Sequence, residues 1–397
     1  MLSSRVVRFV LLAACAFGLS ACMSARPDSA AQAERQAKAE DIVRRGYQPI
    51  EHAAIEAGVQ PWRVDGEMVP IAWTVPASGD ELPVVMYLPG LGEAAESAGV
   101  VWRRAWAQAG YAVVSVQPLG DDATAWNSEE ARSLEFKALA TQRHSAARLQ
   151  QRIRRLAAVL QEMRRRAVDG EAPWRRMDDA RMSVAGYDLG AQTAMTLGGQ
   201  HETGGRNDPL AERFRAVIVL SPVVLPGQAE PTRFDGMAGP VLSVTGPADL
   251  DPTGLVATSS RTIAFDLMPA GSKFELELAD AGHAMLAGAI EPERAAPREE
   301  RASGRAAAPR SGRSRQRSDS GDGERSPSEG SERAGSERTH AREIATAATI
   351  KAECEAAVQV VSVAFLDASL RRRPAAQRWL DEQVPQWLAH LGTWRRR

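Results

Sequence analysis

The sequence predicts an α/β fold with a mostly parallel central sheet and helices on both of its faces. Apolar runs of strand length alternate with segments of helical periodicity, and this alternation is typical of a parallel sheet. A second observation is the short apolar run at 182–185, which passes into an expected helix at 191–197 through a turn that contains Gly186 and Gly190. A third is that polar side chains follow several expected strands, where open α/β sheets bind their ligands.

The first half of the chain contains the signals of two strand–helix units. Strands are expected where β-branched and apolar residues are bounded by glycine and proline, and helices where apolar residues recur every three or four positions. The expected elements are a strand at 68–75, a turn at 76–80, a strand at 82–88, a helix at 102–109, a strand at 111–116 and a long, charged helical stretch at 127–166.

The second half continues the same alternation after the turn at Gly186 and Gly190. The connection at 221–239 separates two of its expected strands and is too short to hold a cap domain. The expected elements are strands at 216–220, 240–245 and 274–278, and helices at 344–370 and 379–388.

Composition divides the chain into segments. Residues 291–342 are rich in arginine, serine, glutamate and glycine, so they cannot bury enough apolar surface to repay the entropy of ordering. The expected organisation is a signal peptide at 1–21, a tether and N-terminal segment at 22–61, an α/β core at 62–290, a disordered insertion at 291–342 and C-terminal helices at 343–397 that complete the same domain.

The N-terminus has the features of a targeting segment. Arg5 and Arg8 precede a short apolar run at 9–19, which ends in Leu-Ser-Ala followed by Cys22. This order of features is similar to the bacterial lipobox, which implies lipidation of Cys22 and attachment to a membrane through that lipid alone. Met23 lacks the aspartate associated with retention at the inner membrane, so we expect an outer-membrane lipoprotein that faces the periplasm.

Three groups follow expected strands in the order Asp188, Asp249, His283. A strand that turns at once into a helix, with glycine two residues before and after the central residue, is typical of a nucleophile elbow, and here the central residue is Asp188. Asp251 competes with Asp249 as the acidic partner of the histidine. His144 has no partner nearby in sequence, so we expect it to be a surface or packing histidine.

These motifs resemble the α/β-hydrolase superfamily, in its dienelactone-hydrolase-like or lipase-like branch. The resemblance covers 62–290 and 343–391 and rests on Pro89-Gly-Leu-Gly-Glu, the elbow Gly-Tyr-Asp-Leu-Gly, Gly-Pro-Ala-Asp249 and Ala-Gly-His283. It implies a fold without a large cap domain. It also implies catalytic roles for Asp188, for His283 as base and for Asp249 as orienting acid, with backbone N–H groups of Leu91 and Leu189 as the oxyanion hole.

Aspartate at the elbow leaves three interpretations open. Asp188 can be a carboxylate nucleophile that displaces a leaving group from carbon, after which His283 activates water to cleave the resulting ester. It can instead act as a base on water in an esterase-like site, because carboxylate attack on an ester would give a reactive anhydride. It can also mark an inactive site in a binding protein. The sequence favours a hydrolase of a small ester, lactone or related molecule.

The partners that the sequence indicates are a small-molecule substrate and a membrane reached through the N-terminal lipid. A formal net charge of −1 gives no reason to expect a nucleic acid, because such partners select strongly basic surfaces. We expect neither a metal ion nor an organic cofactor.

Overall fold

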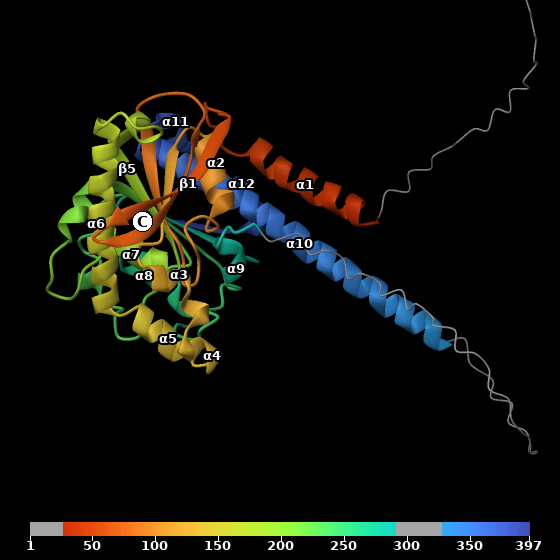
Figure 1. The fold of residues 1–397 in the computed structure, drawn as a ribbon. Coiled ribbons are helices and arrows are strands. Elements are labelled where there is room, and N and C mark those ends of the chain that lie inside the picture. The colour runs from red at the N-terminus through yellow and green to blue at the C-terminus, as the bar shows by residue number, and fades with distance from the viewer. Residues whose placement is uncertain (1–26, 291–327) are drawn as a thin grey trace, which may run out of the picture.

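The computed structural model describes residues 27–290 and 328–397, and it contains one nine-stranded sheet covered by helices (Figure 1). The strand order is β1-β2-β4-β3-β5-β6-β7-β8-β9. The pairs from β4 through β8 are parallel, whereas β1, β2 and β9 pair antiparallel. The predicted fold class, an α/β fold with a mostly parallel central sheet, helices on both faces and no large cap domain, is confirmed, and it is consistent with an α/β-hydrolase fold.

The strands span five to eleven residues each, and several of the central ones are buried along their whole length. Their bounds are β1 Ile55–Val64, β2 Glu67–Pro76, β3 Leu82–Leu88, β4 Ala112–Val116, β5 Met177–Tyr187, β6 Phe214–Leu220, β7 Val241–Thr245, β8 Lys273–Leu278 and β9 Gly392–Arg396.

The longest helices are α6 and α10, and several others are single turns that follow strands. The helix bounds are α1 Pro27–Arg45, α2 Val100–Gln108, α3 Gly120–Ala123, α4 Glu129–Arg132, α5 Phe136–Arg143, α6 Ala146–Val168, α7 Leu189–Leu197, α8 Ile263–Leu267, α9 His283–Leu286, α10 Ser328–Ser369, α11 Pro374–Arg378 and α12 Val384–Leu388.

Two apolar cores lie on opposite faces of the sheet, because successive side chains of a strand point to opposite faces. In β3, Val84 and Met86 join the core under α6, α7 and α8, whereas Val85 and Tyr87 join the core under α2, α10, α11 and α12. The alternation explains why β3 has no polar position: both of its faces are covered.

The edges of the sheet contain two strands that the sequence did not signal. β1 begins at Ile55, near the end of the 22–61 stretch expected to hold a tether and an N-terminal segment, and forms a hairpin with β2. Asp65 and Gly66 both have positive φ in its turn, as a two-residue hairpin turn requires. At the other edge, β9 pairs with β8.

The connection from β6 to β7 holds only a 3₁₀ turn at Pro231–Arg233, so no cap domain is inserted at this point in the described residues. The insertion expected at 291–342 falls largely on 291–327, outside the described residues. Its last part, 328–342, forms the start of α10. The end of α10 is buried in the core, and α1 packs against α10 (Figure 1).

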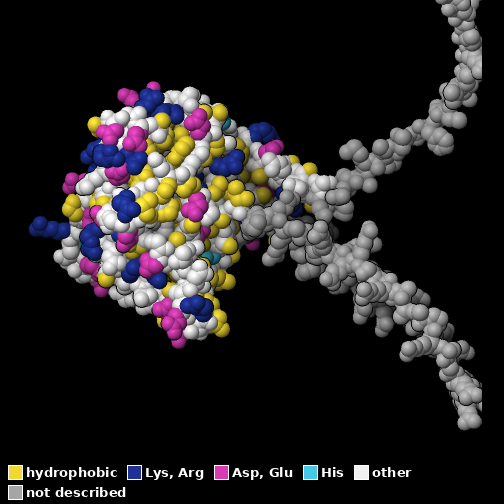
Figure 2. Space-filling model, viewed as in Figure 1, with side chains coloured by type: hydrophobic (Ala, Val, Ile, Leu, Met, Phe, Trp, Pro, Cys, Tyr) yellow, Lys and Arg dark blue, Asp and Glu magenta, His cyan; other side chains and the backbone are white. Residues whose placement is uncertain are grey.

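Charged side chains of both signs are spread over the face of the molecule seen in Figure 2, which agrees with a net charge near zero. In the described ranges, none of the helices combines the length and the apolar character needed to span a bilayer. The predicted lipidation site, Cys22, lies outside the described residues.

Candidate functional site

The turn between β5 and α7 holds Asp188 in a backbone conformation that side chains rarely adopt, with φ 48° and ψ −110°. The Asp188 N–H donates to the Leu220 carbonyl at 3.1 Å and thereby ties this turn to the end of the neighbouring strand β6. A Cβ atom on Gly186 would overlap the backbone of Gly190, and one on Gly190 would overlap the carbonyl of Leu88. The glycines therefore permit close strand–helix packing, and the packing sustains the strain at Asp188.

The Asp188 carboxylate lies at the carboxyl edge of the sheet with 13% of its side chain exposed. Its Oδ2 accepts a hydrogen bond from the Leu91 N–H at 3.3 Å. Leu91 follows β3, so this contact joins two neighbouring strand ends. One of the two predicted oxyanion-hole donors is thus already bound to the side chain of Asp188. Leu189 is the first residue of α7 and is buried directly beside Asp188.

His283 and Asp249, which follow β8 and β7, form the acid–histidine pair expected from the sequence. The His283 Nδ1 lies 2.8 Å from Asp249 Oδ1, and Asp249 is fully buried. Because the carboxylate accepts from Nδ1–H, the second ring nitrogen, Nε2, is left as an acceptor toward the site. The Ser221 and Thr245 hydroxyls also donate to the Asp249 oxygens, each at 2.9 Å.

Arg261 and Asp251 lie near the acid–histidine pair, and only Arg261 contacts Asp249. Arg261 is 1% exposed, lies 3.6 Å from Asp249 Oδ2, and donates to the Ser221 carbonyl. Asp251 instead accepts from the Val256 N–H and from Thr253. Although partial burial raises the pKa of Asp251, these hydrogen bonds hold it below its usual value. Asp249, and not Asp251, is the histidine's partner.

Asp188 and His283 share the carboxyl edge of the sheet but do not touch. Within the described part of the chain, no hydrogen bond or ion pair joins them, and the His283 side chain is 14% exposed. Tyr187 connects the two, because it precedes Asp188 and its hydroxyl donates to the His283 carbonyl at 2.9 Å. Its ring lies 5.0 Å from the His283 ring. Both side chains therefore lie largely buried at one edge of the sheet, with a small exposed fraction each.

Glu93, in the loop after β3, is a further ionisable group near Asp188 and His283. Its Oε2 accepts from the Gly90 N–H at 2.8 Å, and Gln117 donates to the Gly90 and Glu93 carbonyls. Burial raises the pKa of Glu93 to about 7, and the negative charge of Asp188 adds to this effect. The site thus holds a carboxyl group that changes its protonation near neutral pH.

His144 is buried and also lies close to Asp188. Burial lowers its pKa, and its Nδ1 lies 3.0 Å from the Ala140 carbonyl, which fixes Nδ1 as the donor. The Nε2 has no hydrogen-bond partner and lies 4.0 Å from Asp188 Oδ1. Two acceptors face each other there, so a water or substrate hydroxyl placed between them could donate to either one.

A cavity of about 240 Å³ adjoins this histidine. His144, Gln192 and Thr196 line it together with Arg233 and Glu202, whereas Asp188 does not. The Gln192 amide donates to the His144 carbonyl at 2.8 Å and thereby ties the start of α7 to the loop before α6. Most of the side chains that line the cavity are polar, and its volume suits a small ligand of a few heavy atoms.

The structure brings Asp249 and His283 into contact and places Asp188 with Leu91 and Leu189 at the same edge. The sequence did not single out Ser221 or the side chain of Glu93. His144, expected to be a surface or packing histidine, is buried beside Asp188. Ser221 directly follows β6, and Glu93 ends the loop motif after β3, so each had a position-based signal. Among the described residues, no group of three or more histidine, cysteine or acidic side chains is arranged to hold a metal ion.

The chain was also compared with known proteins. No family model matches it, and no curated protein is significantly similar to it.

Proposed function

We propose that this protein is a hydrolase of small esters, lactones or related electrophiles, and that it belongs to the α/β-hydrolase superfamily. The observation that carries the proposal is the pairing of a strained Asp188 elbow with a His283–Asp249 pair at one edge of the sheet. Strained backbone conformations persist where the surrounding fold holds them, and they cluster at functional sites. The strand order, with its antiparallel second strand, supports the same family.

The contacts of Asp188 support a carboxylate nucleophile. With Oδ2 bound to the Leu91 N–H, Oδ1 is the oxygen left to attack carbon and displace a leaving group. The product is an ester of Asp188 in which the carbonyl oxygen lies by the Leu91 N–H. When water attacks this ester, the developing negative charge falls on that oxygen, where the backbone donor stabilises it.

His283 is the base in the second step. Asp249 fixes the tautomer in which Nε2 accepts a proton from water, and it stabilises the imidazolium that results. On an ester or lactone substrate, attack by Asp188 would give an anhydride. For those substrates we propose that Asp188 or His283 takes a proton from water, which attacks the carbonyl carbon directly.

The alternative is a binding protein that keeps the fold without turnover. Two observations favour it: the Leu91 N–H is already engaged by Asp188, and no hydrogen bond joins Asp188 to His283 in the described ranges. Substrate carbonyls would then find no free donor at this position.

Turnover of a panel of short esters, lactones, haloalkanes and epoxides tests the proposal. Asp188→Ala and His283→Ala should each lower kcat/KM by roughly 10² to 10⁴, whereas His390→Ala, at an exposed histidine in the 3₁₀ turn Ala389–Leu391, should not. Esterase activity in Asp188→Ser with none in the wild type would support the binding protein instead.

We further propose that the protein is anchored to the outer membrane through lipid on Cys22. Cys22→Ser should move the full-length protein from the membrane fraction to the soluble fraction. An unchanged distribution would contradict lipid anchoring, and it would leave the proposal for Asp188 unaffected.

A further inference from the structure

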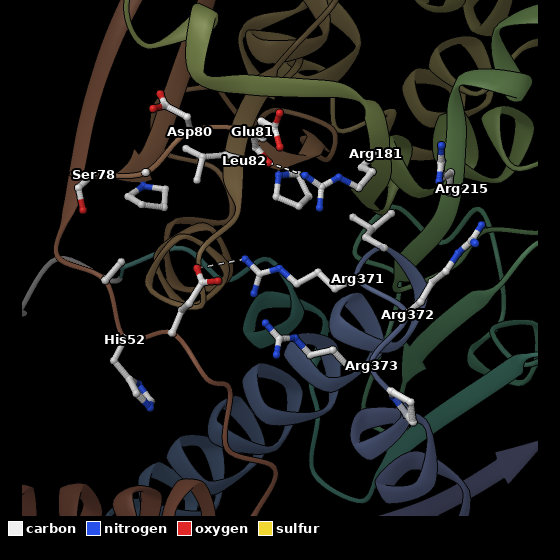
Figure 3. Close-up of a pocket in the computed structure, with 17 residues that line it drawn as sticks. His52, Ser78, Asp80, Glu81, Leu82, Arg181, Arg215, Arg371, Arg372 and Arg373 are labelled. Carbon is white, nitrogen blue, oxygen red and sulfur yellow. Dashed lines mark hydrogen bonds and ion pairs between the residues drawn. The ribbon is translucent and has the colours of Figure 1, made fainter.

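A second site lies at the opposite edge of the sheet from Asp188, in a cavity of about 1050 Å³ (Figure 3). It is bounded by the segment before β1, the β2–β3 turn, the early parts of β5 and β6, and the turn between α10 and α11. Arg181 lines it and lies seven residues before Asp188 on β5, which corresponds to roughly 20 Å along a strand. The cavity is therefore separate from the candidate hydrolase site.

The lining has an excess of positive charge. Figure 3 shows arginine side chains that reach it from three separate segments, with His52 and the acidic residues on the other side. Five arginines and three carboxylates line the cavity, so its formal charge is +2 with the histidine neutral. The charged lining residues are Arg181, Arg215, Arg371, Arg372, Arg373, Glu51, Asp80 and Glu81.

Arg371 is committed to the fold. Its guanidinium donates to the carbonyls of Ala109 and Gly110, pairs with Glu51 at 3.2 Å and with the buried Asp367 at 3.2 Å, and lies over the Tyr111 ring. Cations are also favoured beyond the C-terminus of a helix such as α10. Arg181 is similarly occupied, by Asp178 and by the Glu81 carbonyl.

Three other arginines are not satisfied in this way. Arg215 and Arg372 are exposed and have no hydrogen bond or ion pair within the described residues. Arg373 has only a 3.8 Å approach to Asp367, and its Nε is buried without a hydrogen-bond partner. Arg215 lies at the start of β6, so the dipole of α10 does not account for it. Arg372 adopts a positive φ of 53°, a conformation that costs free energy in a residue other than glycine.

We propose that this cavity binds a ligand through a phosphate group, with Arg215, Arg372 and Arg373 as the donors. Guanidinium groups match phosphate oxygens bidentately, and a doubly charged, multi-oxygen group can engage several of them where a carboxylate offers only two oxygens. A bound anion also relieves the repulsion between neighbouring cations. The cavity has the volume typical of sites for ligands much larger than a lone phosphate, so the phosphate is one part of a larger molecule.

The phosphate can come from a soluble molecule or from a lipid headgroup, and two probes separate these sources. Pyrophosphate binding is measured by calorimetry on the full chain. Association with phosphatidylglycerol vesicles is measured relative to phosphatidylcholine vesicles, so that insertion of any apolar segment cancels in the difference. Both are carried out at low and high salt, because interactions between exposed charges are screened by salt.

The variant is Arg215→Ala/Arg372→Ala, and the matched control is Arg104→Ala/Arg154→Ala. The control removes the same charge at two exposed arginines outside this cavity. We expect the first pair to weaken binding by at least about tenfold, since a hydrogen bond to a charged group is worth that much, and the control to change it less than twofold, roughly as for isolated surface charges.

Pyrophosphate binding with this variant pattern supports a soluble ligand. Vesicle association with the same pattern, without pyrophosphate binding, supports a lipid headgroup. Binding of neither probe, or equal losses in the variant and the control, overturns the proposal. Circular dichroism of both double variants verifies that they are folded. Hydrolase activity is not a readout here, so failure of this site and failure of the proposed hydrolase are distinguishable.

Discussion

Replacing Glu93 with glutamine should make the stability of the protein less dependent on pH between about 4.5 and about 7. Burial, reinforced by the charge of Asp188, raises the pKa of Glu93 from 4.5 to about 7 in the folded protein. The folded state therefore holds this proton more tightly than the unfolded chain. The stabilisation is complete below about pH 4.5 and is lost as the pH rises through about 7.

The size of the effect follows from the two pKa values. A pKa of about 7 against 4.5 corresponds to about 3 kcal/mol of unfolding free energy at most. Between about pH 5 and about pH 8, roughly 2.5 kcal/mol of it should disappear from the wild type. Glutamine keeps an oxygen that can accept from the Gly90 N–H but cannot ionise, so the variant should lack this change.

Urea unfolding of the wild type and Glu93→Gln at these two pH values measures the difference directly. Other carboxylates contribute equally to both proteins and cancel. Glu96→Gln, at an exposed glutamate in the same loop, is the control and should follow the wild type. A pH dependence in Glu93→Gln as large as that of the wild type would refute the reasoning.

Three further predictions concern the stability of the folded protein. Asp188→Asn removes a negative charge that raises the pKa of Glu93. The pH at which the unfolding free energy falls should therefore be lower in this variant than in the wild type, and an unchanged pH midpoint of that fall in urea unfolding would contradict this. Asp122→Ala leaves three arginines without their fully buried partner and should lower the unfolding free energy by about 3–5 kcal/mol, as urea titration would measure. Gly190→Ala forces a Cβ into backbone and should markedly lower the melting temperature, whereas Gly120→Ala, which meets open space, should change it little; similar effects of the two would contradict the close packing at the elbow.

The fold class was predictable because its signals are local. The buried parallel strand β3 is a short apolar run, and the second half of β5 is another, which ends in the turn where Gly186 and Gly190 permit close strand–helix packing. The positions of Asp188 and His283 followed from the ends of strands, since parallel strands bring their carboxyl ends to one edge.

Other features depend on contacts between distant segments, and no local pattern specifies them. β1 and β9 are edge strands of mixed polarity, and β9 acquires its partner only through pairing with β8. His144 looked isolated because Asp188 lies far along the chain, and the two meet only when the segment before α6 packs on α7. Ser221 likewise contributes through Asp249, which lies on a neighbouring strand end.

The loop after β3 was predictable from the sequence only in part. The sequence indicated that Leu91 supplies a backbone donor, but it did not indicate that the Asp188 side chain occupies this donor. Nor did it indicate the raised pKa of Glu93, because that pKa depends on burial and on a charge from another strand.

The central claim, that Asp188 and His283 act in one reaction, is tested most directly by a double-mutant cycle on the best substrate of the panel. The values of kcat/KM are compared for the wild type, Asp188→Ala, His283→Ala and the variant that carries both changes. Groups that act as a unit give losses that do not multiply. We predict that the kcat/KM of the double variant is no lower than that of the less active single variant. Losses that multiply, or a single variant with wild-type activity, would contradict the proposed hydrolase.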